Sequence, residues 1–208
     1  MRSILFFLVP VFIFLTACGP VTINKPEKSA ELKDTVSPVK AEVIVQSTPD
    51  SSLLAYGNLY FGMKKPEVAQ KNENRQQLGK YEYNFGYDFN SDSVLYRVKI
   101  FSDGVKVIGY DTTLKILYQN LVQIVETRYG KPGKHNGFPS VFDVQNSGKY
   151  TTDNWELGNK QIDISLRENA LNSYSVICEI THKKMADAEK TRLKNLKNKD
   201  VIEASKKF

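Results

Sequence analysis

The chain has 208 residues, of which 41% are hydrophobic and 25% are charged, and its formal net charge is +6 at pH 7. This length suits one globular domain with tails and provides enough apolar residues for a core, whereas a protein with several membrane spans would be far more apolar. With two cysteines and two histidines, the sequence excludes a disulfide-stapled scaffold and a cysteine-rich zinc cluster.

The N-terminus carries the clearest signal in the sequence. Arg2 precedes an apolar run over residues 4–15, which is too short to span a bilayer because a spanning helix takes about 20 residues. A short positive segment followed by such a run is typical of a secretory signal peptide. We therefore expect residues 1–17 to be removed from the mature protein.

The tetrapeptide Leu-Thr-Ala-Cys that ends at Cys18 resembles the lipobox of bacterial lipoproteins. The resemblance implies that Cys18 is acylated, as by palmitate, and becomes the first residue of a protein anchored in the cell envelope. The residue that follows the cysteine is Gly19 rather than an aspartate, and within that family this favours sorting to the outer membrane. Each buried CH₂ adds about 0.8 kcal/mol of membrane affinity, so two or three acyl chains hold a protein almost permanently. The alternative is an ordinary secretory signal whose cleavage site happens to contain a cysteine.

Residues 18–52 are predicted to be a flexible tether, since four prolines punctuate a polar run without apolar periodicity. Residues 53–182 are predicted to be the globular domain, and residues 183–208 a basic helical tail. That tail carries nine Lys or Arg residues against four Asp or Glu residues. Because the chain without Arg2 has a net charge of +5, residues 18–182 are close to neutral.

The first half of the domain alternates in the way that strands do. Residues 53–61 predict a strand, and Pro66 predicts the start of a short helix that fades by Asn74. Residues 81–89 place five aromatic side chains at every second position, which predicts a strand with one apolar face. A turn over residues 90–93 leads to a return strand, and the residues that we expect to face inward on it are Val94, Tyr96, Val98 and Ile100.

The second half begins with the longest predicted helix, which we expect to be capped at Asp111 and ended by Gly130 and Pro132. Its apolar stripe consists of Leu114, Leu117, Tyr118, Leu121, Ile124, Val125 and Tyr129. A loop rich in Gly and Pro is expected over residues 133–148. Three strands then follow, with turns at residues 158–159 and 171–173, and the last presents Tyr174, Val176, Cys178 and Ile180 on one face.

This order of elements predicts an α+β fold, in which one curved antiparallel sheet packs against one or two helices. Residues 62–103 and 113–181 both read as a helix followed by antiparallel strands, so the domain could consist of two divergent copies of one unit. The C-terminal tail is expected to form a charged helix.

Gly62-Met63, Val68 and Leu78-Gly79 resemble the signature of small outer-membrane assembly lipoproteins of the SmpA/OmlA (BamE-like) family. Residues 129–132, Tyr-Gly-Lys-Pro, repeat the closing part of that pattern. Tandem helix-plus-sheet units also resemble beta-lactamase-inhibitor-protein-like modules. The first copy lacks the proline expected after Leu78-Gly79. The resemblance implies a non-catalytic binding or scaffolding module, with no catalytic residues and no cofactor.

Candidate partner-binding residues come from the aromatic positions and from one histidine. If an end of the aromatic strand is left uncovered, Tyr81, Tyr83 or Trp155 could form a patch for a partner or a glycan, although core packing accounts for the stripe more simply. His135 lies in a segment expected to be a loop and could contact a ligand.

Other motifs in the sequence fail on their spacing. Residues 88–92 open like a calcium loop, but the loop glycine is replaced by Ser93 and the bidentate glutamate by Lys99. Cys178 is expected to be a small buried hydrophobic residue rather than a nucleophile. The carboxylates that glycoside hydrolysis would need are expected to point outward from amphipathic strands: Glu82, Asp88, Glu156, Asp163 and Glu179.

The charge of the tail suggests a surface role. In an envelope the available anions are lipid head groups and wall polymers, so we expect no nucleic-acid partner. Lys194, Lys197 and Phe208 are candidates for contact with the membrane surface, the alternative being a solvated helix.

The sequence thus predicts a lipid-anchored, non-catalytic envelope protein with a protein partner. The alternatives are an inhibitor or immunity-type lipoprotein, for which residues 133–148 would be the protruding loop, and a glycan or peptidoglycan hydrolase.

Overall fold

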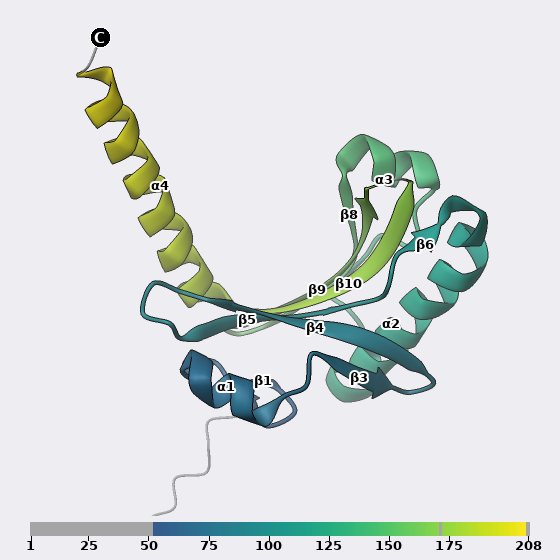
Figure 1. Ribbon diagram of the computed structural model, residues 1–208. Helices are drawn as coiled ribbons and strands as arrows, with labels where there is room; N and C mark the ends of the chain where they lie inside the picture. The colour runs from purple at the N-terminus through teal and green to yellow at the C-terminus, as the bar shows by residue number, and fades with distance from the viewer. Residues whose placement is uncertain (1–51, 171, 207–208) are drawn as a thin grey trace, which may run out of the picture. The chain divides into compact units, whose positions relative to one another are not determined.

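The computed structural model describes residues 52–170 and 172–206, so the predicted signal peptide, Cys18, most of the predicted tether and Phe208 lie outside the described residues (Figure 1). Its fold is α+β, as predicted. The strands and helices, in chain order, are β1 (Leu54–Tyr56), β2 (Leu59–Tyr60), α1 (Lys65–Lys71), β3 (Arg75–Leu78), β4 (Tyr81–Phe89), β5 (Leu95–Phe101), β6 (Val105–Lys106), α2 (Lys115–Tyr129), β7 (Lys134–His135), α3 (Val141–Ser147), β8 (Lys149–Leu157), β9 (Lys160–Asn169), β10 (Ser173–His182) and α4 (Lys183–Ser205).

One antiparallel sheet forms the centre of the domain. Its strand order is β3-β4-β5-β10-β9-β8-β7, and β6 pairs with the end of β10. After α1, strands β3, β4 and β5 form a three-stranded meander, and after α2, strands β8, β9 and β10 form another, with β7 added at its edge. The two meanders join where β5 pairs with β10. This order is the one expected if a helix-plus-sheet unit occurs twice along the chain.

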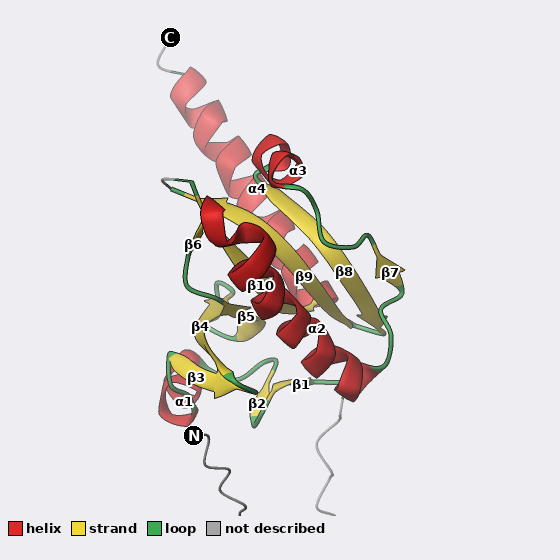
Figure 2. Cartoon of the chain, turned by 90° about the vertical axis from the view of Figure 1, so that its right-hand side faces the viewer, coloured by secondary structure: helices red, strands yellow, loops and turns green. Residues whose placement is uncertain are grey.

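The core lies between one face of the sheet and the elements that cover it. Figure 2 shows α2 crossing the strands on this face. Leu114, Tyr118, Leu121 and Val125 are buried there, which confirms most of the predicted stripe, whereas Ile124 at its margin is 37% exposed. Val68 of α1 belongs to the same cluster of buried side chains.

Several boundaries agree with the sequence patterns. β4 spans residues 81–89 as predicted, β8 and β9 are joined by the predicted turn at residues 158–159, and the inward face predicted for the last strand is buried. α2 ends where expected, because Gly130 has a φ of 77°, a conformation that glycine adopts at little cost. Cys178 is buried, and burial raises the pKa of its thiol to about 12.

Four local predictions are wrong, and one strand, β3 over residues 75–78, was not predicted. The strand expected over residues 53–61 is a hairpin of β1 and β2. The segment 133–148 contains β7 and α3, which begins with a capping box at Ser140. A 3₁₀ turn over 107–109 and a π-helical turn over 110–114 precede α2, so Asp111 does not cap that helix.

The fourth error is in β5, where Leu95 is fully buried in place of Val94 and Tyr96. The ladder of β4 and β5 is irregular between Asp88 and Phe89, so that Asp88 lies opposite Arg97 and Phe89 lies opposite Leu95. The extra residue, Tyr96, shifts the alternation by one position, as a β-bulge does.

α4 leaves the end of β10 on the side of the sheet opposite α2, as Figures 1 and 2 both show. Its N-cap is His182, whose Nδ1 accepts a hydrogen bond from the Met185 backbone N–H at 3.4 Å. Glu189 is the one buried residue of the described helix. The later turns carry exposed apolar side chains: Leu193, Leu196, Val201 and Ile202.

Candidate functional site

The face of the sheet opposite α2 is not covered by α1 or α2. Side chains alternate along a strand, so the residues between the core positions project to this other face. Across the ladders, Lys99 lies opposite both Gly86 and Glu179, and Glu179 lies opposite Asp163. We call this surface the open face, and its members are Gly86, Asp88, Arg97, Lys99, Phe101, Lys149, Gln161, Asp163, Arg167, Ile177, Glu179 and Thr181.

Ion pairs connect four strands of the open face. Asp88 accepts hydrogen bonds from Lys99 at 2.8 Å and from Arg97 at 3.3 Å. Arg97 also lies 3.7 Å from Glu179, which pairs in turn with Lys149. Because each carboxylate meets two cations and is largely shielded from water, this network fixes its side chains more firmly than isolated surface pairs would.

The charge state of Glu179 follows from these neighbours. Burial by itself would raise its pKa, but the hydrogen bond from Lys149 and the positive charges of Lys149, Arg97 and Lys99 outweigh burial and lower the pKa. Glu179 is therefore an ionised acceptor at neutral pH. A general acid for glycoside hydrolysis needs the opposite shift.

Two depressions open on this surface. The central one has a volume of about 320 Å³, with an apolar floor of Gly86, Phe101 and Ile177. Its rim carries the charged side chains of Lys99, Lys149, Arg167 and Glu179. Arg167 forms no ion pair with any residue in the described part of the chain, so its guanidinium is available at this rim.

The second depression has a volume of about 430 Å³ and lies where α4 leaves the sheet. Tyr96, Thr181 and Leu193 line it together with charged residues of the sheet and the helix. Glu189 fixes the helix beside it, because its carboxylate accepts a hydrogen bond from the Ser91 backbone N–H at 3.3 Å and pairs with Arg192. The β-bulge at Tyr96 thus turns an aromatic side chain toward this depression.

His135 has partners that the sequence did not reveal. Its Nδ1 lies 2.5 Å from Oδ1 of Asp153, and the Tyr118 hydroxyl donates a hydrogen bond of 2.8 Å to Oδ2 of the same carboxylate. Asp153 is buried, whereas 60% of the His135 side chain is exposed. Burial, together with the hydrogen bond to Asp153 and its charge, raises the pKa of Tyr118.

This cluster lines a cavity of about 520 Å³ with Lys115, Glu126 and Phe138. The carboxylate orients the imidazole so that its other nitrogen can bind a ligand. Within the described segments, no hydroxyl or thiol side chain is hydrogen-bonded to His135, so a nucleophile for triad chemistry is not placed beside it. The pairing of β7 with β8 creates the contact, and two residues 18 positions apart gave no signal of it.

The exposed aromatic patch predicted for Tyr83 and Trp155 is wrong, because both side chains are buried. The Tyr83 hydroxyl donates to the Leu117 carbonyl oxygen at 3.0 Å, and Trp155 Nε1–H donates to the Gly130 carbonyl oxygen at 2.8 Å. Both therefore attach α2 to the sheet. Tyr81 is half-buried against the core.

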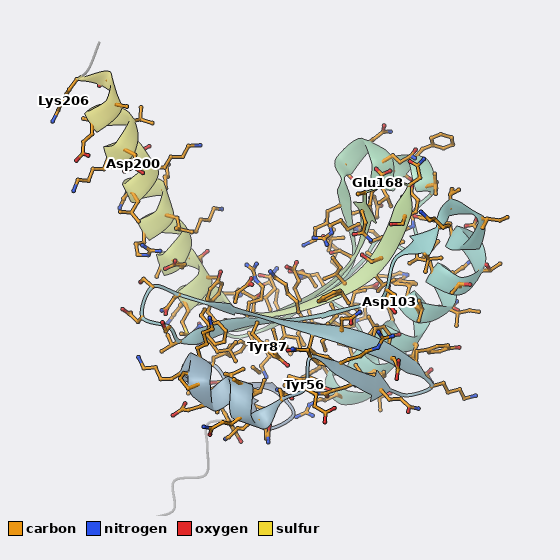
Figure 3. All side chains as sticks on the ribbon, viewed as in Figure 1. Tyr56, Tyr87, Asp103, Glu168, Asp200 and Lys206 are labelled. Atoms are coloured by element: carbon orange, nitrogen blue, oxygen red, sulfur yellow. The ribbon has the colours of Figure 1, made fainter. Side chains whose placement is uncertain are left out.

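The predicted membrane-contact residues lie on a distal helix. Lys194 and Lys197 are exposed on α4, and Figure 3 shows Asp200 on the part of α4 that has left the sheet and Lys206 at the C-terminal end of this helix. Phe208 lies outside the described residues. Contact of these residues with a membrane stays a prediction.

The geometry defines an α+β protein with one covered and one open sheet face. Comparison with protein-family models, with curated proteins and with solved structures finds no match for this chain. The resemblance to SmpA/OmlA or beta-lactamase-inhibitor-like modules therefore stays a prediction. Among the described helices, none is long and apolar enough to cross a bilayer. Over residues 52–170 and 172–206, no three His, Cys, Asp or Glu side chains are arranged to hold a metal ion.

Proposed function

We propose that this protein is a lipoprotein of the bacterial cell envelope, held at the outer membrane by acyl chains on Cys18. We further propose that it binds a protein partner through the open face and does not catalyse a reaction. The observation that carries the proposal is the open face itself. A sheet with one covered face leaves a broad surface on which two depressions lie within a network of ordered charges.

The chemistry of this surface suits a protein partner. Protein interfaces combine an apolar centre, into which an anchoring side chain fits, with a polar rim. The central depression has this composition, since Phe101 and Ile177 form its floor and cations surround it. The excess of cations at this rim favours a partner that presents acidic side chains around an apolar anchor.

The carboxylates on the open face favour binding over hydrolysis. The negative charge of Glu179 is balanced by ion pairs with Arg97 and Lys149. Asp163 accepts hydrogen bonds from the amide groups of Asn154 and Gln161. Glu156, which lies opposite the open-face residue Gln161, pairs with Lys183. Each of these carboxylates is committed to a donor, whereas hydrolysis needs one carboxyl group that is kept protonated.

The inhibitor alternative depended on a protruding loop. The segment 133–148 contains β7 and α3 and is anchored at two points, because Val144 of α3 is fully buried and the Tyr110 hydroxyl donates to the Pro139 carbonyl oxygen. We therefore favour the open face over this segment as the binding surface.

The binding proposal is tested by photo-crosslinking in the native envelope. A photo-reactive residue at Lys99 should give one discrete protein adduct, whereas the same residue at Gln123, an exposed position on α2, should not. The adduct should be weakened at least tenfold by Arg167→Glu and unchanged by Lys71→Glu. Equal adducts from both faces, or no adduct from folded protein, would contradict the proposal.

The anchor is tested separately. Cys18→Ser should abolish incorporation of labelled palmitate and move the protein from the membrane fraction to the soluble fraction. Retention of the variant in the membrane, with a wild-type mass equal to that of the unacylated chain, would show that Cys18 is not the anchor.

A further inference from the structure

Lys160, the first residue of β9, is buried without an acidic partner. Only 5% of its surface is exposed, and in the described part of the chain no carboxylate lies within ion-pair distance of it. Burial and then the nearby positive charge of Arg128 lower its pKa. Proteins seldom bury an ammonium group without a carboxylate beside it, because removing the charge from water is costly.

The two cations lie close to one aromatic ring. The Lys160 Nζ lies 5.4 Å from the centre of the Tyr129 ring, and the guanidinium carbon of Arg128 lies 5.6 Å from the same centre. Contact with the ring stabilises each cation in part. It does not use the three N–H donors of the ammonium group, and it leaves the repulsion between the two cations in place.

The end of α2 offers a second partial explanation. The last carbonyls of a helix attract cations, and Arg128 and Tyr129 form the end of α2. However, the Gly130 carbonyl oxygen accepts from Trp155, and the Glu126 carbonyl oxygen accepts from the Gly130 N–H. No hydrogen bond joins Lys160 Nζ to these carbonyls, so the helix end does not complete its hydrogen bonding.

A cavity of about 350 Å³ lies beside these cations. Arg128 and Lys160 supply positive charge to its walls, Leu54, Leu157 and Tyr129 supply apolar surface, and Ser52 completes the lining. It shares no lining residue with the two depressions of the open face. The cavity therefore suits an anionic group attached to an apolar group.

We propose that this cavity binds the phosphate group of an organic phosphate ester, with Arg128 and Lys160 contacting the phosphate oxygens and Leu54 and Leu157 contacting the organic part. A phosphate group can carry two negative charges and offers several acceptor oxygens, which matches an arginine fork and a lysine ammonium placed together. The site goes beyond the proposed partner binding and is independent of it. Phosphate esters of this kind occur both as soluble metabolites and as lipid head groups.

The test uses the full chain and its single tryptophan. Trp155 lines the adjoining cavity together with Tyr129 and Leu157, so its fluorescence should report occupancy. At constant ionic strength, phenyl phosphate should give a saturable fluorescence change. Lys160→Met should weaken this binding at least tenfold, whereas Lys80→Gln, which removes an exposed lysine elsewhere, should leave it unchanged.

Thermal unfolding separates loss of the site from loss of the fold. Phenyl phosphate should raise the Tm of the wild type but not of Lys160→Met, because only a bound ligand shifts the equilibrium. Without ligand, Lys160→Met should unfold at the same temperature as the wild type or above it, since methionine keeps the length of the side chain and removes a buried charge.

Comparison of ligands shows whether the bound phosphate ester is a lipid head group or a soluble metabolite. A soluble short-chain phosphatidic acid that binds at least tenfold more tightly than phenyl phosphate would indicate a lipid head group, and equal affinities would indicate a soluble ester. Affinity for phenyl phosphate that is equal in the wild type and in Lys160→Met, or a signal that follows ionic strength alone, would overturn the proposal. Inorganic phosphate binding as tightly as phenyl phosphate would overturn the assignment of the apolar wall.

Discussion

At the scale of single residues, the position of Asp153 depends on one extra residue in β8. Thr151 lies opposite Ser165 on the open face, but Asp153, two residues later, lies opposite Ile164 on the core face. The bulged residue Thr152 reverses the alternation, and its hydroxyl donates to the Ile164 carbonyl oxygen at 2.9 Å. A carboxylate is thereby placed under α2, where it needs hydrogen-bond donors.

Tyr118→Phe should therefore lower the free energy of unfolding by about 1.5–3 kcal/mol, the usual effect of losing a hydrogen bond to a charged group in the interior. The change removes one of the two hydrogen bonds to the buried Asp153 carboxylate. Urea unfolding at pH 7 measures the effect.

Tyr60→Phe is the matched control, because Tyr60 is half-buried and its hydroxyl makes no hydrogen bond within the described segments. A loss for Tyr118→Phe no larger than that of the control would mean that Asp153 is satisfied without the tyrosine.

At the scale of secondary-structure elements, long periodic patterns and the glycine that ends α2 gave correct predictions, whereas the start of α2 and the capping box of α3 were not predicted. β4 and α2 have long periodic patterns, so their existence and inward faces follow from the sequence. β3 and α3 are short and polar, and they form because neighbouring elements pair with them or pack on them, as Val144 does. The two bulges, at Tyr96 and Thr152, reverse side-chain direction without any pattern that marks them.

The candidate sites also divide into features that a local pattern predicts and features that only tertiary contacts create. Burial of the aromatic stripe was foreseeable from its period, but Trp155 and Tyr83 proved to be buried by α2 rather than left at an uncovered end. The contact of His135 with Asp153, and that of Lys160 with Tyr129, join residues whose proximity depends on tertiary structure. Sequence patterns within one element carry no information on such contacts.

The first turn of α4 should be sensitive to pH through His182. Burial lowers the pKa of this imidazole below its usual value, and the positive charge of Lys184 contributes in the same direction. Since the unfolded chain binds the proton more readily, stability falls as the pH is lowered from about 6.5 toward the folded pKa. Protonation at Nδ1 would also remove the acceptor for the Met185 N–H.

His182→Asn keeps a side-chain acceptor at the N-cap and removes the titration. The free energy of unfolding of the wild type should therefore fall more steeply than that of the variant between pH 7 and pH 5, as measured by urea unfolding at both values. Parallel slopes in wild type and variant would assign the pH dependence to another group.

At the scale of the whole domain, the sheet separates two kinds of surface. One face holds the core and α2, and the phosphate site proposed at the end of α2 lies beside β1, near the beginning of the described chain. The other face carries the ion-pair network and the base of α4. Partner binding and phosphate binding can therefore be changed independently by mutation.

The two halves of α4 should contribute unequally to stability. Met185 packs against the core and Glu189 is bonded to Ser91, whereas Leu196 and Val201 are exposed at 45% and 60%. A chain ending at Lys194 should keep both depressions of the open face and lose less than about 2 °C of Tm, because changes at exposed positions have little effect. A chain ending at Lys184 loses the packed turns and should fall by roughly 4–8 °C, as expected for about 2 kcal/mol.

Thermal unfolding of both truncated chains measures this difference, and photo-crosslinking at Lys99 shows whether the partner surface survives. The chain ending at Lys194 should crosslink like the wild type, because Leu193, which lines the depression, is retained. The chain ending at Lys184 should crosslink less, since it lacks one wall of that depression. If both truncations lowered the Tm equally, the distal turns of α4 would have to pack against the protein in solution, and the open face would be smaller than the structure shows.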